Sequence, residues 1–299
     1  MGKIAFVFSG QGDQYPGMGK ELYEQYESAA SVFQMCDHLR PGTMQQCFTG
    51  TAEELKETVN TQPCLFAMEL AAAAVLLEKG VKPDAVAGFS LGEVAAATAA
   101  GIFDLETGFR LVCRRGQLMQ KEAEKFDTAM AAVVKLSPET VMELCAMFPD
   151  IYPVNFNCPG QTSVSGLSSQ MPAFTAEVRA AGGRVLPLKV KGAFHSPFMA
   201  EAAAAFAGDL AKADIHQASI PLYSNVTAEP YAENAAALLS KQIASPVQWE
   251  KLIRNMIAAG IDCFLEIGPG KALTNMIRKI DPQVTACTVT EYLTEVTVC

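Results

Sequence analysis

The sequence of 299 residues lacks paired cysteine motifs and long apolar runs. Its nine cysteines are odd in number and scattered, with no CxxC pair, which is typical of reduced thiols and not of a disulfide framework or a zinc site. No uninterrupted apolar run approaches the ~18 residues of a membrane span, and the N-terminal stretch does not resemble a signal peptide. We therefore expect a cytoplasmic protein with no membrane partner.

Basic charge is also scarce. The sequence has 23 Lys and Arg residues against 32 Asp and Glu residues, a net charge of −9, so we expect no nucleic-acid partner. Hydrophobic residues make up 50% of the chain, which excludes a mostly disordered protein. At roughly 150 residues per domain, the length predicts about two domains, or one domain with an insertion.

Strands and helices alternate in the first part of the chain. The apolar runs at residues 4–8 and 84–88 predict buried parallel strands, each followed by a helix-like segment. The order β-α-β-β-α-β in the middle of the chain is typical of a ferredoxin-like unit. We predict an α/β protein: a larger α/β-hydrolase-like domain with a parallel sheet, formed by residues 1–125 and 192–299, and an inserted smaller ferredoxin-like α+β subdomain at residues 126–191.

The motif G-F-S-L-G at residues 88–92 has the form G-x-S-x-G and stands between a predicted strand and a predicted helix. Such a turn exposes the serine oxygen, and the N-terminus of the helix offers backbone N–H groups to an oxyanion. We therefore favour Ser90 as a nucleophile over the alternative of an ordinary glycine-rich turn.

A serine nucleophile needs a base, and the sequence offers three histidines. His38 lies in a polar stretch and His216 in a predicted loop, so we interpret both as structural or surface residues. His195 lies where the chain leaves the inserted subdomain, a common place for a cleft, and is the candidate base. No histidine follows His216, which counts against an ordinary esterase or lipase.

Arg115 has only apolar neighbours at three and four positions on either side, so it lies on the inward face of a predicted helix. A buried guanidinium needs an anionic partner. Two alternatives are open: a structural pair with an Asp or Glu, and a clamp for a substrate carboxylate.

A series of short motifs, in the same order along the chain, resembles the malonyl-CoA:acyl carrier protein transacylase family. The motifs are F-S-G-Q-G at residues 8–12, G-F-S-L-G-E at 88–93, R-L-V and R-G within 110–116, N-F-N and P-G-Q within 155–161, G-A-F-H-S at 192–196, P-V-Q-W at 246–249 and E-I-G-P-G-K at 266–271. Together they cover residue 4 to about residue 280.

The resemblance implies a role for each candidate residue. Ser90 is then the acylated nucleophile and His195 its base. The backbone N–H groups of Gln11 and Leu91 form the oxyanion hole. Arg115 holds the free carboxylate of the malonyl group.

Two further residues, Gln248 and Phe194, are assigned by the same resemblance, and Phe89 departs from it. Gln248 helps to orient His195, and residues 245–248 also have the pattern of a capping box at a helix start. Phe194 is similar to the residue of malonyl-selective members, because a bulky ring beside the α-carbon would crowd an added methyl group. Phe89 departs from the family, since many members have histidine there, which leaves the local tuning of the site open.

The implied activity is that of an acyltransferase. It transfers the malonyl group of malonyl-CoA to the phosphopantetheine thiol of acyl carrier protein in a ping-pong reaction, without a metal or redox cofactor. The product supplies fatty acid or polyketide synthesis, and malonate-decarboxylase chemistry is a further alternative. Two other functions stay open: a serine hydrolase of acyl thioesters, and a non-catalytic module that docks carrier proteins.

The overall negative charge makes a local basic patch necessary for binding CoA or an acidic carrier. Lys189 and Lys191 alternate on a predicted strand at residues 184–190, so they share a face and are candidate contacts for CoA phosphates or the carrier. The alternative is a solvated strand edge. The sequence does not determine the oligomeric state, and a monomer is compatible with it.

Overall fold

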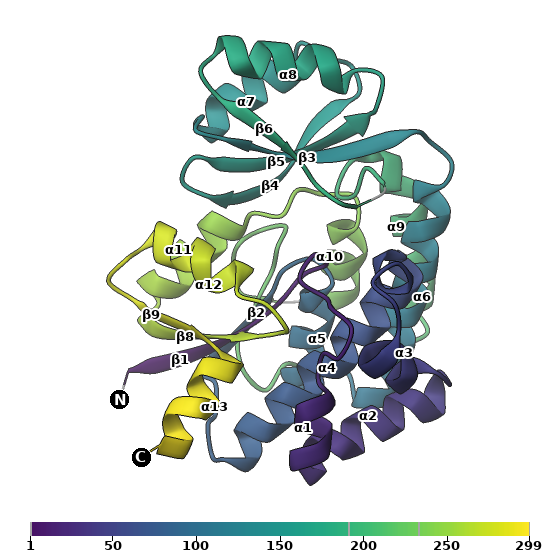
Figure 1. The fold of residues 1–299 in the computed structure, drawn as a ribbon, viewed down its shortest axis with the longest axis vertical. Helices are drawn as coiled ribbons and strands as arrows, with labels where there is room; N and C mark the ends of the chain where they lie inside the picture. Colours follow the sequence, from purple (N-terminus) through teal and green to yellow (C-terminus); the bar gives the residue numbers. More distant parts are fainter. Residues whose placement is uncertain (1, 191, 233, 299) are drawn as a thin grey trace.

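The computed structural model describes residues 2–190, 192–232 and 234–298, the side chains of residues 295–298 excepted. Within these residues the chain forms two sheets, a five-stranded one in the order β7-β2-β1-β8-β9 and a four-stranded one in the order β4-β5-β3-β6. Figure 1 shows the two sheets in separate parts of the molecule, with the four-stranded sheet at the top. The predicted fold class, a parallel α/β part with an inserted ferredoxin-like part, is confirmed.

All strand pairs of the larger sheet are parallel. Its strands are β1 (Lys3–Phe8), β2 (Ala85–Gly88), β7 (Leu222–Tyr223), β8 (Ile261–Ile267) and β9 (Thr285–Thr288). The central strands are buried because helices cover both faces, which is why they are continuous apolar runs in the sequence. The carboxyl ends of these strands meet at one edge of the sheet.

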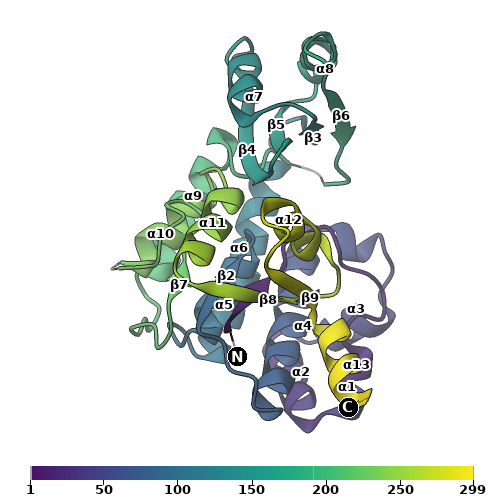
Figure 2. The same cartoon turned by 90° about the vertical axis from the view of Figure 1, so that its left-hand side faces the viewer.

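The helices of the larger part surround this sheet (Figures 1 and 2). They are α1 (Lys20–Gln25), α2 (Glu27–Leu39), α3 (Thr43–Thr49), α4 (Thr58–Glu78), α5 (Gly92–Ala99), α6 (Leu105–Ala123), α9 (Ala200–Leu210), α10 (Ala235–Gln242), α11 (Trp249–Ala258), α12 (Ala272–Ile280) and α13 (Val289–Val298), with short 3₁₀ turns at Glu54–Lys56 and Pro197–Met199. Helix α6 begins directly after Asp104, whose carboxylate accepts a hydrogen bond from the Thr107 N–H.

The four-stranded sheet is antiparallel. Its elements follow the predicted order: β3 (Thr128–Val134), α7 (Pro138–Cys145), β4 (Ile151–Cys158), β5 (Gln161–Leu167), α8 (Met171–Ala180) and β6 (Arg184–Pro187). Helices α7 and α8 cover the face turned away from the larger part (Figures 1 and 2) and enclose a separate small core. The subdomain limits at residues 126 and 191 stay predictions.

Two local predictions are wrong. Residues 245–248 are not a capping box, because α11 begins at Trp249 and its N-cap residue makes no side-chain capping bond. The strand predicted to reach residue 190 ends at Pro187, and among the described residues only one further backbone bond to β3 follows it, from the Leu188 N–H to the Met130 carbonyl oxygen at 2.9 Å. Lys189 therefore lies beyond the strand, and Lys191 lies outside the described residues.

Helix α4 is long and apolar enough to cross a membrane by length and composition alone. However, 78% of its most apolar window is buried inside the structure, where α4 packs against α2 and α6. A core helix passes the same test, so this property is weak evidence for a membrane span.

Candidate active site

The serine of the G-x-S-x-G motif lies in a sharp turn between β2 and α5. Its φ is 56°, in the left-handed region that residues with a side chain rarely adopt. Glycine is required on both sides of the turn: a Cβ at Gly88 would lie 1.9 Å from the Gly92 carbonyl group, and one at Gly92 would lie 2.4 Å from the carbonyl oxygen of Phe8. The motif therefore holds Ser90 at the carboxyl end of β2, directly before the N-terminus of α5.

His195 lies beside Ser90, with 2.7 Å between the Ser90 Oγ and the His195 Nε2 atoms. The other ring nitrogen, Nδ1, lies 2.9 Å from the Gln242 carbonyl oxygen and 3.2 Å from that of Ser245. Carbonyl oxygens only accept hydrogen bonds, so we assign the proton to Nδ1, which leaves the Nε2 lone pair to accept from the serine hydroxyl. The sequence-based pairing of Ser90 with His195 agrees with this geometry.

Burial is the main cause of the low pKa of His195, and the nearby charge of Arg115 adds to it. Together they lower this pKa to about 4, so the ring is neutral at pH 7. A neutral imidazole with a free Nε2 lone pair is the form that can take a proton from a hydroxyl group.

The prediction that Gln248 orients His195 is wrong. Two backbone carbonyls, those of Gln242 and Ser245, occupy the position at Nδ1. Gln248 instead lies at the start of α11, where its backbone N–H donates to the Asn225 carbonyl oxygen. The loop that contains Gln248 therefore reaches the histidine, but through the main chain of Ser245.

Arg115 is 1% exposed and points from α6 toward the serine. Its guanidinium donates to three oxygens: Gln62 Oε1 at 2.9 Å, Gln242 Oε1 at 2.7 Å and the Ser90 Oγ at 3.3 Å. All three acceptors are neutral, and the Arg115 Nε has no partner within the described residues. Burial lowers the pKa of Arg115 to about 10, so it remains a cation at pH 7.

The sequence left open whether Arg115 pairs with an Asp or Glu. In the part of the chain that the structure describes, no carboxylate contacts its guanidinium. A buried cation without an anionic contact is costly. Its position within reach of the serine oxygen is suited to a negatively charged group attached there.

A cavity of about 80 Å³ surrounds the serine. It is lined by Gln11, Gln62, Phe89, Ser90, Leu91, Met119, Met130, Asn155, Leu188, Val190, Phe194 and His195. The predicted oxyanion-hole residues, Gln11 after β1 and Leu91 after Ser90, thus lie on the same cavity. The backbone N–H of each has no acceptor among the described residues, so both are available to a ligand.

Three residues that hold the site together were missed by the sequence analysis. Asn225, after β7, accepts from the Ser90 N–H at 2.8 Å and donates to the Gly88 carbonyl oxygen at 2.6 Å. The side chain of Gln242 donates to the Ser90 carbonyl oxygen at 2.6 Å and to Glu93 at 2.7 Å. Glu93 belongs to the serine motif, but nothing in the sequence distinguishes Asn225 or Gln242.

The comparisons with known proteins agree with this geometry. Residues 5–293 match the family model described as the acyl transferase domain. The chain belongs to this family. It is 36% identical over 299 residues to the malonyl CoA-acyl carrier protein transacylase of Bacillus subtilis, across 97% of this chain and 94% of that protein. The resemblance inferred from the motifs is confirmed.

Solved structures of the acyl transferase family superpose over almost the whole chain. The malonyl CoA-acyl carrier protein transacylase from Clostridium perfringens has a TM-score of 0.94 and 32% identity, covering 99% of this chain and 98% of that one. A malonyl-transacylase in complex with a holo type II PKS acyl-carrier protein has a TM-score of 0.92 and 33% identity, covering 96% and 95%.

Phe89 departs from the histidine of many acyl transferase family members. Its ring packs edge-on against Trp249 at a centroid distance of 5.4 Å. A Cβ at Gly10 would lie 2.9 Å from this ring, so the loop after β1 approaches closely. The Phe89 ring therefore packs between α11 and the loop that contains Gln11, and its side chain has no polar atom to take part in the reaction.

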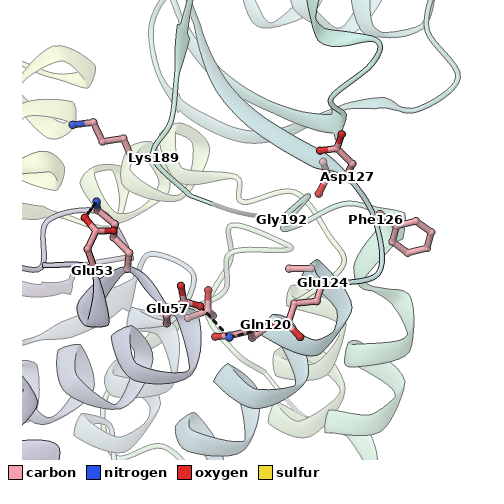
Figure 3. Close-up of a pocket in the computed structure, with 12 residues that line it drawn as sticks. Glu53, Glu57, Gln120, Glu124, Phe126, Asp127, Lys189 and Gly192 are labelled. Atoms are coloured by element: carbon pink, nitrogen blue, oxygen red, sulfur yellow. Dashed lines mark hydrogen bonds and ion pairs between the residues drawn. The ribbon is translucent and has the colours of Figure 1, made fainter. Parts of the chain in front are cut away.

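A second cavity, of about 440 Å³, lies next to the first. The Gln11 side chain, on the first cavity, donates to the Thr58 hydroxyl, on the second, at 3.5 Å. Lys189 and Glu53 lie on one side of this cavity and Asp127 on the other (Figure 3). Of the two lysines proposed for CoA or the carrier, Lys189 thus lines a cavity beside the serine.

Proposed function

We propose that this protein transfers the malonyl group from malonyl-CoA to the phosphopantetheine thiol of acyl carrier protein. One observation carries the proposal: the Ser90 Oγ lies between the neutral His195 Nε2, at 2.7 Å, and the buried Arg115 guanidinium, at 3.3 Å. A hydroxyl with a base on one side and a cation on the other is suited to accept an acyl group that ends in a carboxylate.

In the first half-reaction, the Ser90 hydroxyl attacks the thioester carbonyl while His195 takes its proton. The carbonyl oxygen becomes an oxyanion held by the N–H groups of Gln11 and Leu91; removing one such donor typically costs about 2.7–4 kcal/mol. The intermediate collapses, its carbon–sulfur bond breaks, and His195 returns the proton to the departing CoA thiol. Malonyl-Ser90 ester remains.

In the second half-reaction, the phosphopantetheine thiol of the carrier is the nucleophile. His195 takes the thiol proton, sulfur attacks the ester carbonyl, and the oxyanion again lies against Gln11 and Leu91. The ester bond breaks and Ser90 recovers its proton from His195. The chemistry balances without a metal or redox cofactor, so none is proposed.

Selectivity for malonyl follows from two residues. Arg115 favours an acyl chain with a free carboxylate, because a neutral chain leaves the buried guanidinium without an anion in direct contact. Phe194, 7% exposed, lies on the cavity and narrows the space beside the α-carbon. We further propose a cytoplasmic location, which is favoured by the buried free thiols of Cys36, Cys47, Cys64, Cys145 and Cys158.

The experiment that tests the proposal is intact-protein mass spectrometry after exposure to malonyl-CoA. Wild type is expected to carry one malonyl group, which Ser90→Ala removes and the control Ser31→Ala, on an exposed helix face, retains. Adding holo acyl carrier protein is expected to discharge the adduct onto the carrier. Release of free malonate without transfer would indicate a hydrolase, and neither adduct nor malonate would indicate a docking module.

A further inference from the structure

A buried carboxylate lies behind the catalytic residues. Glu93, in the first turn of α5, is 0% exposed. Its Oε1 accepts from the Asn225 N–H at 3.0 Å and from the Tyr231 hydroxyl at 2.6 Å, and its Oε2 accepts from the Gln242 side-chain amide at 2.7 Å. The Glu93 backbone N–H donates to the Ser90 carbonyl oxygen at 3.1 Å. Among the described residues, its side chain bonds neither Ser90 nor His195 and does not line the cavity, so the mechanism above does not use the carboxylate.

The hydrogen-bond partners of Glu93 indicate which protonation state of its side chain the site favours. Two of them, the Asn225 N–H and the Gln242 amide nitrogen, can only donate. An ionised carboxylate accepts from both and from the Tyr231 hydroxyl. A glutamine presents an NH₂ donor to one of them, and a protonated acid fits only with its hydrogen directed at the Tyr231 oxygen. The site is therefore built for the carboxylate, even though burial alone disfavours charge.

Gln242 connects this carboxylate with Ser90, Arg115 and His195. Its amide nitrogen donates to Glu93 and to the Ser90 carbonyl oxygen, and its amide oxygen accepts from Arg115. Its backbone carbonyl accepts from His195. The amide thus lies between an anion and a cation, with its nitrogen toward the anion and its oxygen toward the cation, and Glu93 is the anion that favours this orientation.

We propose that Glu93 is a positioning residue that, through the Gln242 amide, holds Arg115 in the orientation that selects an acyl chain with a free carboxylate. The inference rests on the proposed function. If the orientation of the Gln242 amide is lost, its NH₂ group faces the guanidinium, donor against donor, and Arg115 turns away from the Ser90 Oγ.

The decisive variant is Glu93→Gln, which keeps the size of the side chain and removes its charge. The rates of Ser90 acylation by malonyl-CoA and by acetyl-CoA are compared by mass spectrometry. The malonyl rate is expected to fall roughly 100-fold, as for a small displacement of a positioning group, and the malonyl-to-acetyl ratio roughly tenfold. A ratio equal to that of wild type would overturn the inference, since a general loss of structure lowers both rates together.

The matched control is Glu122→Gln on α6. Glu122 is also buried and makes an ion pair with Lys125 at 2.8 Å, but it does not contact the residues of the site. Its variant is expected to keep the ratio of wild type. A double variant tests the route: Glu93→Gln should add nothing to the loss caused by Gln242→Ala, whereas additive losses would contradict action through Gln242.

The pH dependence of the malonyl-to-acetyl ratio separates a positioning role from a purely structural one, which would not change it. Burial raises the pKa of Glu93 to about 7, and the charged and titratable groups that face it are Arg115 and Tyr231. Because the ionised form is needed, the malonyl-to-acetyl ratio should fall as the pH decreases through about 7. Tyr231→Phe removes one donor to the carboxylate, so the fall should move to higher pH. An unmoved midpoint in this variant, which retains the Glu93 carboxylate, would contradict the inference.

A measurement without substrate separates this inference from the proposed function. In protein labelled with ¹⁵N-arginine, the Nε–H resonance of Arg115, assigned with Arg115→Lys, should shift in Glu93→Gln and stay unchanged in Glu122→Gln. An unchanged resonance in Glu93→Gln would overturn the inference whatever the enzyme acylates. Absence of a malonyl adduct on wild type would overturn the proposed function alone.

Discussion

The two sheets of this protein contribute to the active site in different ways. In the parallel sheet, Gln11 follows β1, Ser90 follows β2 and Asn225 follows β7, so three neighbouring strands deliver these residues to one edge. In the antiparallel sheet, successive strands end at opposite edges, and the residues that reach the cavity, Met130 and Asn155, come from within β3 and β4. Parallel strands therefore concentrate the reacting groups, whereas the antiparallel sheet supplies a wall.

The two sheets meet at the loop that holds the base. Val247 forms a β-bridge with Asn155 on β4. The Val247 N–H donates to the Val154 carbonyl oxygen, and the Val247 carbonyl oxygen accepts from the Phe156 N–H, both at 2.9 Å. Two residues earlier, the Ser245 carbonyl oxygen accepts from His195. The antiparallel sheet is thus connected to the catalytic base through the short segment of residues 245–247. Substitutions at the edge of the parallel sheet should affect catalysis, and substitutions on the wall should affect the choice of substrate or carrier.

The largest effect is expected from removing the base. His195→Ala should lower kcat by a factor on the order of 10⁴–10⁶, as for other members of a catalytic unit. Steady-state transfer of malonyl to acyl carrier protein measures it. His216→Ala, at an exposed histidine beside Asp214, is the control and should retain wild-type activity. If His195→Ala kept a tenth of the activity, the base would have to be another group.

The next effect separates binding of the carboxylate from catalysis. Arg115→Ala should lower kcat/KM for malonyl-CoA roughly 10²–10⁴-fold, in line with about 3–5 kcal/mol for breaking a buried ion pair. Acylation by acetyl-CoA should not fall, because that chain has no carboxylate to hold. Arg114→Ala, which removes a half-exposed arginine paired with Asp209, is the control. Equal losses for both acyl groups would mean that Arg115 supports the fold and not the choice of substrate.

Phe194, directly before the base, tests which side chain controls the space beside the α-carbon of the acyl group. Phe194→Ala should raise the relative acceptance of methylmalonyl-CoA roughly 10–200-fold, the range for one methyl group in a closed pocket. Competition between malonyl-CoA and methylmalonyl-CoA, read by mass spectrometry, gives the ratio. Phe198→Ala removes an aromatic ring that packs on Phe126 and Tyr152, away from the serine cavity, and should leave the ratio unchanged. A ratio that stays at the wild-type value in Phe194→Ala would place the selectivity elsewhere.

Lys189, beyond the end of β6, tests whether this side of the molecule meets the carrier. Lys189→Glu should raise the KM for acyl carrier protein a few-fold at low salt, with little change in kcat, because charged rims act mainly on encounter. The effect should shrink as salt is added. Lys82→Glu, before β2 at the opposite edge of the parallel sheet, is the control. A carrier KM that does not change would favour the solvated edge considered from the sequence.

The residues predicted correctly are those with a local signature. Ser90 stands in a motif whose glycines are required, because an added Cβ at either would lie about 2 Å from backbone atoms. Arg115 is the charged residue on an otherwise apolar helical face. His195 was found because the chain has so few histidines. The fold could be predicted from the apolar runs, which indicate buried strands, and from the order of strands and helices along the chain.

The residues missed act through contacts that leave no such signature. Gln242 accepts from His195 with its main-chain carbonyl, a group that every residue has, across 47 positions of sequence. Its side chain meets Arg115, Ser90 and Glu93 only because α10 ends beside α5 and α6 in space. The resemblance of P-V-Q-W to a family motif led to Gln248. That residue lies in the same loop as Ser245, whose carbonyl oxygen has the second of the two bonds to the histidine.

The smallest effect distinguishes these two glutamines. Gln248→Ala should change kcat/KM less than about threefold, the range of a substitution away from any buried network, because its side chain makes no contact with His195. Gln242→Ala keeps the carbonyl that His195 needs but loses the bonds to Arg115 and Ser90, so it should reduce malonyl transfer far more. Both variants can be measured in one assay with malonyl-CoA. If Gln248→Ala proved the more damaging of the two, the base would be held by a side chain, and the loop before α11 would have to change its conformation when substrate binds.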